Sequence, residues 1–199
     1  MRAVVIGTFV LLCASSASAQ RVNGVTDLAG APVDLFAKAI SSHGPPERLT
    51  TTILIFTTTD CPISNRYAPE IKRLASEYTA PVIINFFLVF PVPSDFKDPA
   101  RVRKHLADFD YGVTAILDTK QSLVKLAGVT VTPEAAVIDP KGRVVYRGRI
   151  DDRYIELGKD RVTPTTHDLE NVLKQAVVMN PIKPRRTIAV GCYLSDLLK

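Results

Sequence analysis

The chain has 199 residues, of which 46% are hydrophobic and 23% charged, enough for one globular domain with a substantial core. Its formal charge of +5 falls to +4 if an N-terminal leader containing Arg2 is removed. The basic residues are scattered among acidic ones and do not form the basic stripe typical of a nucleic-acid-binding protein. We therefore expect a solvated surface of mixed charge and no nucleic-acid partner.

The first residues have the pattern of an export signal. Arg2 gives a positive start, residues 3–12 form an apolar run too short to span a bilayer, and small residues precede a cleavage point after Ala19. We predict a signal peptide over residues 1–19, hence a periplasmic or secreted protein without a membrane span. Cys13 leaves a lipoprotein anchor as an alternative.

Turn signals and apolar runs predict the elements of the first half of the mature chain. Gly30-Ala31-Pro32 lies between two short apolar arms, which indicates a small hairpin over residues 25–35. The prolines and glycine of residues 41–48 indicate a loop. The remaining predicted elements are a buried strand at residues 53–56, a helix at 66–78 that ends at Ala80-Pro81, and a strand at 82–89 buried on both faces.

The second half alternates helices and strands before an irregular tail. Asp98 followed by Pro99 is typical of a helix cap with proline in the first turn. A tight turn at residues 139–142 predicts an antiparallel hairpin around it. The predicted elements are a helix at residues 98–108, a strand at 114–117, a helix at 120–127 closed by Gly128, strands at 135–138 and 144–146, a charged loop at 147–164 and a helix at 166–179.

This order of elements predicts an α/β domain over residues 20–180. A central mixed sheet would be flanked by helices, with parallel strands in its middle and an antiparallel edge. An N-terminal hairpin would precede the sheet, and a tail at residues 181–199 would carry Cys192.

Cys61 lies where a predicted strand turns into a predicted helix. Unpaired backbone N–H groups and the positive end of the helix dipole favour a thiolate at such a position, which predicts a reactive sulfur. Burial as a small apolar side chain is the alternative. After removal of the leader, Cys61 and Cys192 are the only two cysteines, and an exported protein can keep them as a disulfide.

Three features resemble the thioredoxin-like superfamily, in particular its redoxin or peroxiredoxin-related branch. Thr58-x-x-Cys61-Pro62 is similar to the motif around a peroxidatic cysteine, Thr132-Pro133 stands where thioredoxins have a cis-proline, and residues 27–35 resemble the hairpin that opens many redoxin domains. The resemblance implies a thioredoxin-like fold with Cys61 as nucleophile, Thr58 as its hydrogen-bonding neighbour and Pro133 shaping the substrate groove. It implies no cofactor and no metal.

The departures from that family are also informative. Ser64 replaces the second cysteine of a thioredoxin motif, Leu54 replaces a proline, and the arginine expected near Pro133 is missing. Cys61 therefore has no local partner. Cys192 lies on the proline-rich tail next to Gly191, a residue that lets the backbone approach another segment closely, so the tail could fold back and Cys192 could resolve an oxidised Cys61.

Two functions remain open from the sequence. The first is an exported thiol oxidoreductase that reduces a peroxide or exchanges disulfides, with electrons returned by a thioredoxin-like protein. The second is a non-catalytic binding or structural module, with residues 147–164 as its recognition surface and Cys61–Cys192 as a structural disulfide that would contribute on the order of 5 kcal/mol. A metal site formed by Cys61, Cys192 and His167 is a minor alternative because the ligand spacing matches no known motif.

Overall fold

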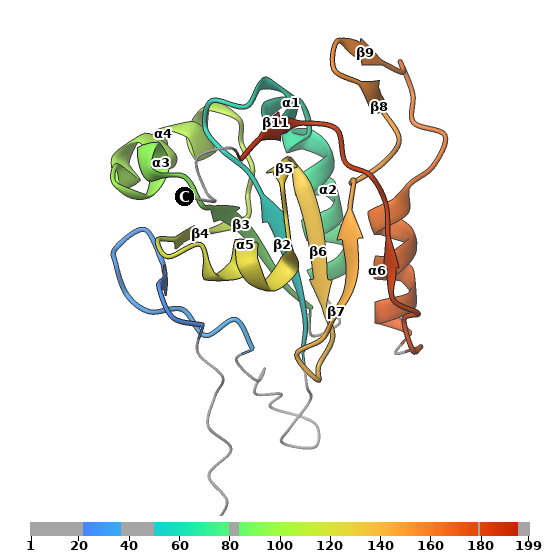
Figure 1. Cartoon of the computed structure of the whole chain (residues 1–199), viewed down its shortest axis with the longest axis horizontal. Helices are drawn as coiled ribbons and strands as arrows, with labels where there is room; N and C mark the ends of the chain where they lie inside the picture. The colour runs from blue at the N-terminus through green and yellow to red at the C-terminus, as the bar shows by residue number, and fades with distance from the viewer. Residues whose placement is uncertain (1–21, 37–49, 80–83, 179, 195–199) are drawn as a thin grey trace, which may run out of the picture.

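The computed structural model of the chain describes residues 22–36, 50–79, 84–178 and 180–194. The predicted signal peptide at 1–19, the predicted loop at 41–48 and the helix end at Ala80-Pro81 lie outside these residues. A seven-stranded mixed sheet occupies the centre, with the strand order β1-β4-β3-β2-β6-β7-β10 (Figure 1). The predicted α/β class with helices flanking a mixed sheet is therefore confirmed.

The elements follow one another in an alternating order. The strands are β1 (Val25–Thr26), β2 (Thr51–Phe56), β3 (Ile84–Phe90), β4 (Thr114–Asp118), β5 (Val131–Thr132), β6 (Glu134–Ile138), β7 (Val144–Gly148), β8 (Tyr154–Glu156), β9 (Lys159–Asp160), β10 (Arg185–Arg186) and β11 (Cys192–Tyr193). The helices are α1 (Pro62–Arg66), α2 (Ala68–Thr79), α3 (Pro93–Phe96), α4 (Pro99–Asp108), α5 (Ser122–Ala127) and α6 (Asp168–Val177).

Strand β2 is the centre of the core, and every residue of it is buried. It pairs in parallel with β3 and antiparallel with β6. Because successive side chains of a strand point to opposite faces, Ile53 and Ile55 pack into a cluster with α2 and α6, whereas Leu54 and Phe56 pack into a cluster with α5. Figure 1 shows α2 and α6 on one side of the sheet and α5 on the other.

Several local signals in the sequence are confirmed by the structure. The Asp98 carboxylate accepts the Arg101 backbone N–H at 3.1 Å and caps α4, as predicted. Gly128 ends α5 in the left-handed conformation with φ of 70°. Strands β6 and β7 form the predicted antiparallel hairpin. The Thr132-Pro133 peptide bond is cis, as the resemblance implied.

Other segments differ from the prediction. The helix expected at 66–78 begins at Pro62, directly after Cys61, and is interrupted at Tyr67, which caps the end of α1. The predicted opening hairpin is present as an antiparallel bridge between Thr26 and Pro32 with backbone hydrogen bonds from Asp27 to Ala31 and from Val33 to Val25, and β1 in addition pairs with β4. The short helix α3, which begins at a proline, has no counterpart among the predicted elements.

The C-terminal tail is more regular than the sequence predicts. Strand β10 extends the main sheet by pairing in parallel with β7, and β11 pairs antiparallel with β5 in a separate two-stranded sheet. The charged loop at 147–164 also contains strands, since β8 and β9 form a small hairpin that projects from the domain (Figure 1). Among the described residues, no helix has both the length and the apolar character needed to cross a membrane.

Candidate functional site

Cys61 follows the carboxyl end of β2 after a short loop and is the N-cap of α1. Its backbone has φ of −85° and ψ of 107°, and its sulfur accepts the backbone N–H of Ser64 at 3.5 Å. Pro62 occupies the first position of the helix, where the missing N–H carries no penalty. The strand therefore places the sulfur against an unpaired N–H of the first helical turn, as the sequence predicted.

The Thr132-Pro133 segment lies against the same sulfur. Strands β2 and β6 pair with Phe56 opposite Glu134, so the end of one strand meets the start of the other. The Cys61 sulfur lies 3.0 Å from the Thr132 carbonyl oxygen, to which it donates when it is a protonated thiol. Two positions separated by 71 residues thus meet because of one antiparallel strand pair.

Cys192 reaches Cys61 from the C-terminal tail. Strand β11 places Cys192 opposite Thr132 in the antiparallel ladder, and because the Cys61 sulfur lies against Thr132, the two thiols are close together in one hydrophobic cluster. Both cysteines are free thiols, with Cys61 buried and Cys192 half-buried. A Cβ atom at Gly191 would lie 2.1 Å from the Thr132 carbonyl oxygen, so the close approach expected of this glycine is found.

The two thiols have pKa values shifted in opposite directions. Burial tends to raise the pKa of Cys61, but hydrogen bonds from Cys192 and Ser64 to its sulfur outweigh that effect, and the pKa is lowered. The pKa of Cys192 is raised to about 12 by burial, by its hydrogen bond to Cys61 and by the negative charge there. The arrangement favours a Cys61 thiolate beside a protonated Cys192.

A buried carboxylate supports the loop that precedes Cys61. Asp95, at 0% exposure, accepts the Thr59 hydroxyl at 2.6 Å and the Thr59 N–H at 3.1 Å. Burial raises the pKa of Asp95, although these hydrogen bonds act in the opposite direction. Arg101 donates to the Thr59 hydroxyl at 2.8 Å and pairs with Asp60. The network fixes the backbone that enters the site.

Tyr111 is a second supporting residue that the sequence did not indicate. It is fully buried, and its hydroxyl donates to the Ser64 carbonyl oxygen at 3.0 Å. Burial raises the pKa of Tyr111, and the charge of nearby Cys61 raises it further. Tyr111 and Asp95 lie far from Cys61 in the sequence and belong to no motif, so no local signal could have indicated their role.

The remaining candidate residues take other positions. Thr58 contacts Cys61 through the backbone, since the Thr58 carbonyl oxygen accepts the Cys61 N–H at 3.3 Å. Among the described residues, no hydrogen bond joins the Thr58 hydroxyl to the Cys61 sulfur. His167 lies near Glu70 and Glu170, where Arg73 binds both carboxylates. The metal site suggested for His167 and the two cysteines is therefore not formed.

No protein-family model and no curated protein sequence matches the chain, whereas several solved structures do. A conserved uncharacterised protein from Geobacillus kaustophilus has a TM-score of 0.67 at 20% identity, covering 88% of this chain and 90% of its own. A hypothetical protein from Sinorhizobium meliloti has a TM-score of 0.60 at 22% identity, covering 72% of this chain and 78% of its own.

A putative thioredoxin from Neisseria meningitidis has a TM-score of 0.51 at 20% identity, covering 75% of this chain and 83% of its own. The chain has the thioredoxin-like fold. Within this thioredoxin-like fold, the second cysteine is supplied by a C-terminal strand, whereas Ser64 occupies the position three residues after Cys61. The comparison shows that the fold is shared with these proteins. The positions of the two sulfurs are given by the contacts of Cys61 and Cys192 with Thr132 in this chain.

Titration of the reduced thioredoxin-like protein without residues 1–19, and hence without Cys13, should show two well-separated thiols. Because the folded-state pKa of Cys61 is lowered, thiolate absorbance in the ultraviolet should begin to rise below the ordinary cysteine pKa of about 8.5. The second thiolate should form only near pH 12. Cys61→Ser should remove the early rise, and Cys192→Ala should move it to higher pH by removing a donor. A first midpoint at or above that of a free thiol would contradict the assignment.

Proposed function

We propose that the chain is an exported thiol–disulfide oxidoreductase with Cys61 as nucleophile and Cys192 as resolving thiol. The observation that carries this proposal is that β11 and the start of α1 bring both thiols to Thr132, with their pKa values moved apart. Groups whose environments separate their pKa values commonly divide the roles of a reaction between them. Export rests on the predicted signal peptide.

The reaction would proceed in two balanced exchanges. The Cys61 thiolate attacks a partner disulfide, forming a Cys61–partner mixed disulfide and releasing one partner thiolate. Cys192 then loses its proton and attacks the Cys61 sulfur, forming the Cys61–Cys192 disulfide and releasing the second partner thiolate. Two electrons pass from the cysteine pair to the partner, and an external thioredoxin-like dithiol would restore the pair.

The pKa of Cys192 supports this order of events. Besides burial, the hydrogen bond to Cys61 and the negative charge there raise it. Once Cys61 is held in a mixed disulfide, that charge is gone, so the pKa of Cys192 should fall and its thiolate should become available. The resolving thiol would thus stay protonated until it is needed.

The peroxide reaction named by the family resemblance is a second candidate with less support. An arginine that would stabilise the thiolate and polarise a peroxide is absent from the contacts of Cys61 among the described residues. Arg101 pairs with Asp60, and Arg147 pairs with Glu134. The third interpretation is a non-catalytic module in which Cys61 and Cys192 form a permanent structural disulfide, called a staple below. It predicts that the two cysteines do not exchange with an added disulfide.

The proposal is tested with reduced protein and an aromatic disulfide that releases a coloured thiol. Wild-type protein without residues 1–19, and hence without Cys13, should release two coloured thiols per molecule and gain the Cys61–Cys192 disulfide, identified by peptide mass spectrometry. Cys61→Ser should form no such bond. Reduced protein treated with hydrogen peroxide and a sulfenic-acid trap should be labelled slowly at Cys61; fast labelling would favour the peroxide reaction, and no reaction with either reagent would favour the staple.

A further inference from the structure

The structure contains a cavity that the proposed thiol reaction does not use. It has a volume of about 200 Å³ and lies between β5, β6, β7 and residues 186–189 of the C-terminal tail. Of the described residues, neither Cys61 nor Cys192 lines it. One water molecule takes about 30 Å³ of liquid, so the cavity can hold several waters or one small organic molecule.

Two arginines lie side by side in the wall of this cavity. Strand β10 pairs in parallel with β7, and the register places Arg186 opposite Arg147. Paired residues of neighbouring strands point to the same face of a sheet, so both guanidinium groups project on one side, and both residues line the cavity. Like charges directly opposite each other are destabilising. This pair is therefore unfavourable unless negative charge lies close to it.

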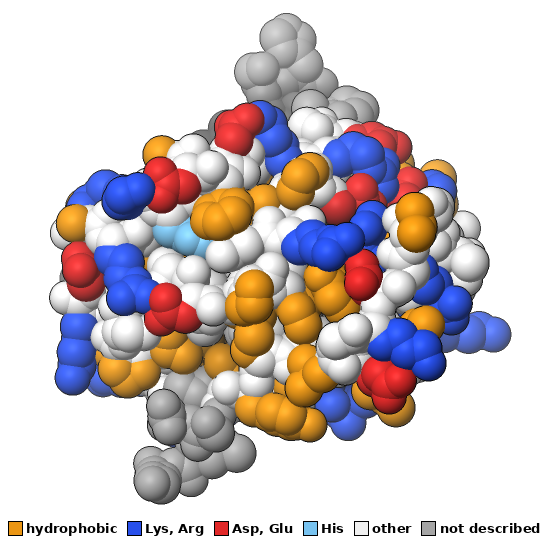
Figure 2. Space-filling model, turned by 90° about the horizontal axis from the view of Figure 1, so that it is seen from above, with side chains coloured by type: hydrophobic (Ala, Val, Ile, Leu, Met, Phe, Trp, Pro, Cys, Tyr) orange, Lys and Arg blue, Asp and Glu red, His pale blue; other side chains and the backbone are white. Residues whose placement is uncertain are grey.

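The neighbouring arginine of β10 shows how such a charge is usually accommodated. Arg185 lies on the other face, with its guanidinium 5.6 Å from the centre of the Tyr146 ring, and it donates to the Asp168 carbonyl oxygen at 2.8 Å. Figure 2 likewise shows Lys and Arg side chains interspersed with Asp and Glu on one face of the molecule. Within the described part of the chain, the exposed Arg186 guanidinium makes no hydrogen bond and no ion pair.

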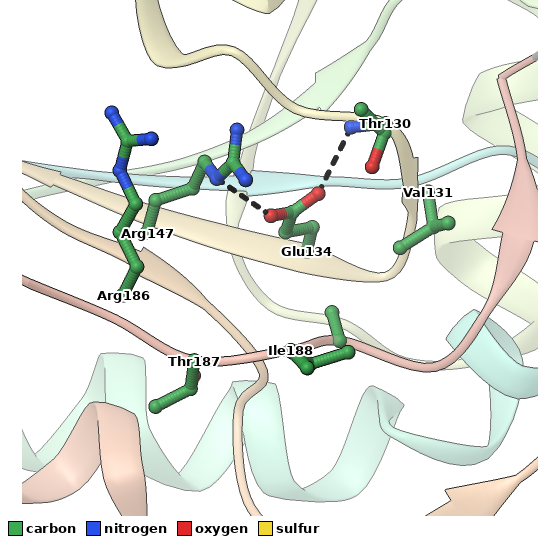
Figure 3. Close-up of a pocket in the computed structure, with 8 residues that line it drawn as sticks. Thr130, Val131, Glu134, Arg147, Arg186, Thr187 and Ile188 are labelled. Atoms are coloured by element: carbon green, nitrogen blue, oxygen red, sulfur yellow. Dashed lines mark hydrogen bonds and ion pairs between the residues drawn. The ribbon is translucent and has the colours of Figure 1, made fainter.

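A single carboxylate faces the two arginines. Glu134 is 2% exposed, accepts the Thr130 N–H at 3.0 Å and pairs with Nε of Arg147 at 3.1 Å (Figure 3). Arg147 also donates from Nη1 to the Gly128 carbonyl oxygen, which leaves its Nη2 without a partner among the described residues. Because the lining holds two arginines and one glutamate, the cavity carries an excess of one positive charge.

The remaining part of the lining includes an apolar wall, formed by Val131, Ile188 and Ala189. Figure 3 shows Val131 and Ile188 on the side of the cavity away from Arg186. The Ile188 side chain is 86% exposed, although it is large and apolar. A short hydrocarbon group placed against this wall would remove apolar surface from water, which is favourable.

We propose that this cavity binds a small organic acid, with its anionic oxygens between the guanidinium groups of Arg147 and Arg186 and a short apolar body against the apolar wall. A guanidinium group offers parallel N–H donors that match a carboxylate or a phosphate, so either head group fits. The inference goes beyond the oxidoreductase proposal, because it uses neither cysteine. The ligand would contact β7 and the tail together, so it should hold the tail against the domain.

The test is a titration of the folded protein with small acids, followed by NMR. Sodium butyrate and propyl phosphate should each cause saturable shifts of the Nε–H signals of Arg147 and Arg186 in the wild-type protein. Sodium chloride at the same ionic strength should not, because it only screens the charges. Acetate has the head group without the longer apolar body and should bind more weakly than butyrate.

Variants of Arg186 test the role of the arginine pair. Arg186→Gln should weaken binding of both probes by at least about 10-fold, because charge-assisted hydrogen bonds are lost. Arg186→Lys keeps the charge without the planar donors and should weaken binding less. Arg147 is left unchanged, because its loss would leave the buried Glu134 carboxylate without its cation.

Lys141→Gln is the matched control and should bind both probes like the wild type. Lys141 is an exposed cation in the turn of the β6–β7 hairpin, at the end opposite Arg147. Tighter binding of propyl phosphate than of butyrate would identify a phosphate ester as the ligand class, and the reverse order a carboxylic acid. Shifts that do not saturate, or equal affinities of the wild type and Arg186→Gln, would overturn the inference.

The result does not depend on the thiol chemistry. Cys61→Ser abolishes the proposed reaction but leaves every residue of the cavity in place, so it should bind butyrate and propyl phosphate with wild-type affinity. Saturating ligand should also raise the melting temperature of the wild type and of Cys61→Ser by the same amount, and that of Arg186→Gln by much less. An increase of equal size in all three proteins would contradict the assigned site.

Discussion

Cys192→Ser is expected to release one coloured thiol per chain from an aromatic disulfide and then to stop. Cys61 is still able to attack, because the introduced serine hydroxyl would keep a hydrogen-bond donor near its sulfur, but no thiol remains to resolve the mixed disulfide. With an external reductant, the steady-state rate should fall by about 100-fold or more, since resolution then depends on a bimolecular step. The absorbance of the released thiol gives the number released per chain and the steady-state rate, and mass spectrometry identifies the adduct at Cys61.

The same variant separates a working pair from a structural staple. A structural disulfide would close a very long loop, so its loss would lower the free energy of unfolding of the oxidised protein by on the order of 5 kcal/mol in the chain-entropy model, and its melting temperature with it. For a working pair, the Cys61–Cys192 disulfide of the oxidised wild type should be reduced by a dithiol under mild conditions, whereas a structural disulfide should resist the same treatment. Continued turnover by Cys192→Ser would show that Cys61 relies on an external thiol.

Asp118→Ala should cause a large loss of stability. The Asp118 side chain is fully buried at the end of β4 and accepts the backbone N–H groups of Ser122, Leu123 and Val124 at 2.8, 2.9 and 3.1 Å. The residue at the N-cap of α5 is Gln121, which makes no capping bond with its side chain. The Asp118 side chain therefore caps the N-terminus of α5 in place of the Gln121 side chain.

Removal of the carboxylate leaves three backbone donors without their acceptor. We expect a loss of about 3 kcal/mol in the free energy of unfolding, combining a lost cap with unsatisfied buried groups. For a chain of this size, that corresponds to a melting temperature lower by about 6–12 °C. Asp118→Asn keeps one acceptor oxygen and should lose less.

Asp108→Ala is the matched control on an exposed helix end. Asp108 pairs with Lys104 at 2.6 Å, but both side chains are largely exposed, and such pairs contribute about 0–1 kcal/mol. Thermal unfolding monitored by circular dichroism should therefore separate the two variants clearly. Similar melting temperatures for Asp118→Ala and Asp108→Ala would contradict the capping role.

The central strands were predictable because a short, continuous apolar run indicates a strand that is buried on both faces. Residues 53–56 and 84–89 lie in strands, and the side chains of β2 are buried on both faces, as continuous runs without charge predict. The caps at Asp98 and Gly128 were also predictable, because their hydrogen bonds and backbone angles are local. The end of β2 then placed Cys61 correctly at a helix start.

The tail could not be predicted in the same way. Strands of two residues such as β10 and β11 carry too little pattern, and their pairing is decided by contacts with segments far away in the sequence. Asp95 and Tyr111 illustrate the same limit in the site. Their roles follow from burial beside Thr59 and Ser64, which only the folded chain reveals.

The register between β2 and β6 joins the chemistry to the core. Phe56 lies opposite Glu134, and Ile55 lies opposite Ala135. A change of one residue in the length of β6 would move Thr132 away from the Cys61 sulfur and would also turn the buried side chains of the strand to the wrong faces. Insertions and deletions should therefore be tolerated only in the loops, because the position of Pro133 beside Cys61 depends on the same strand register as the packing of the core.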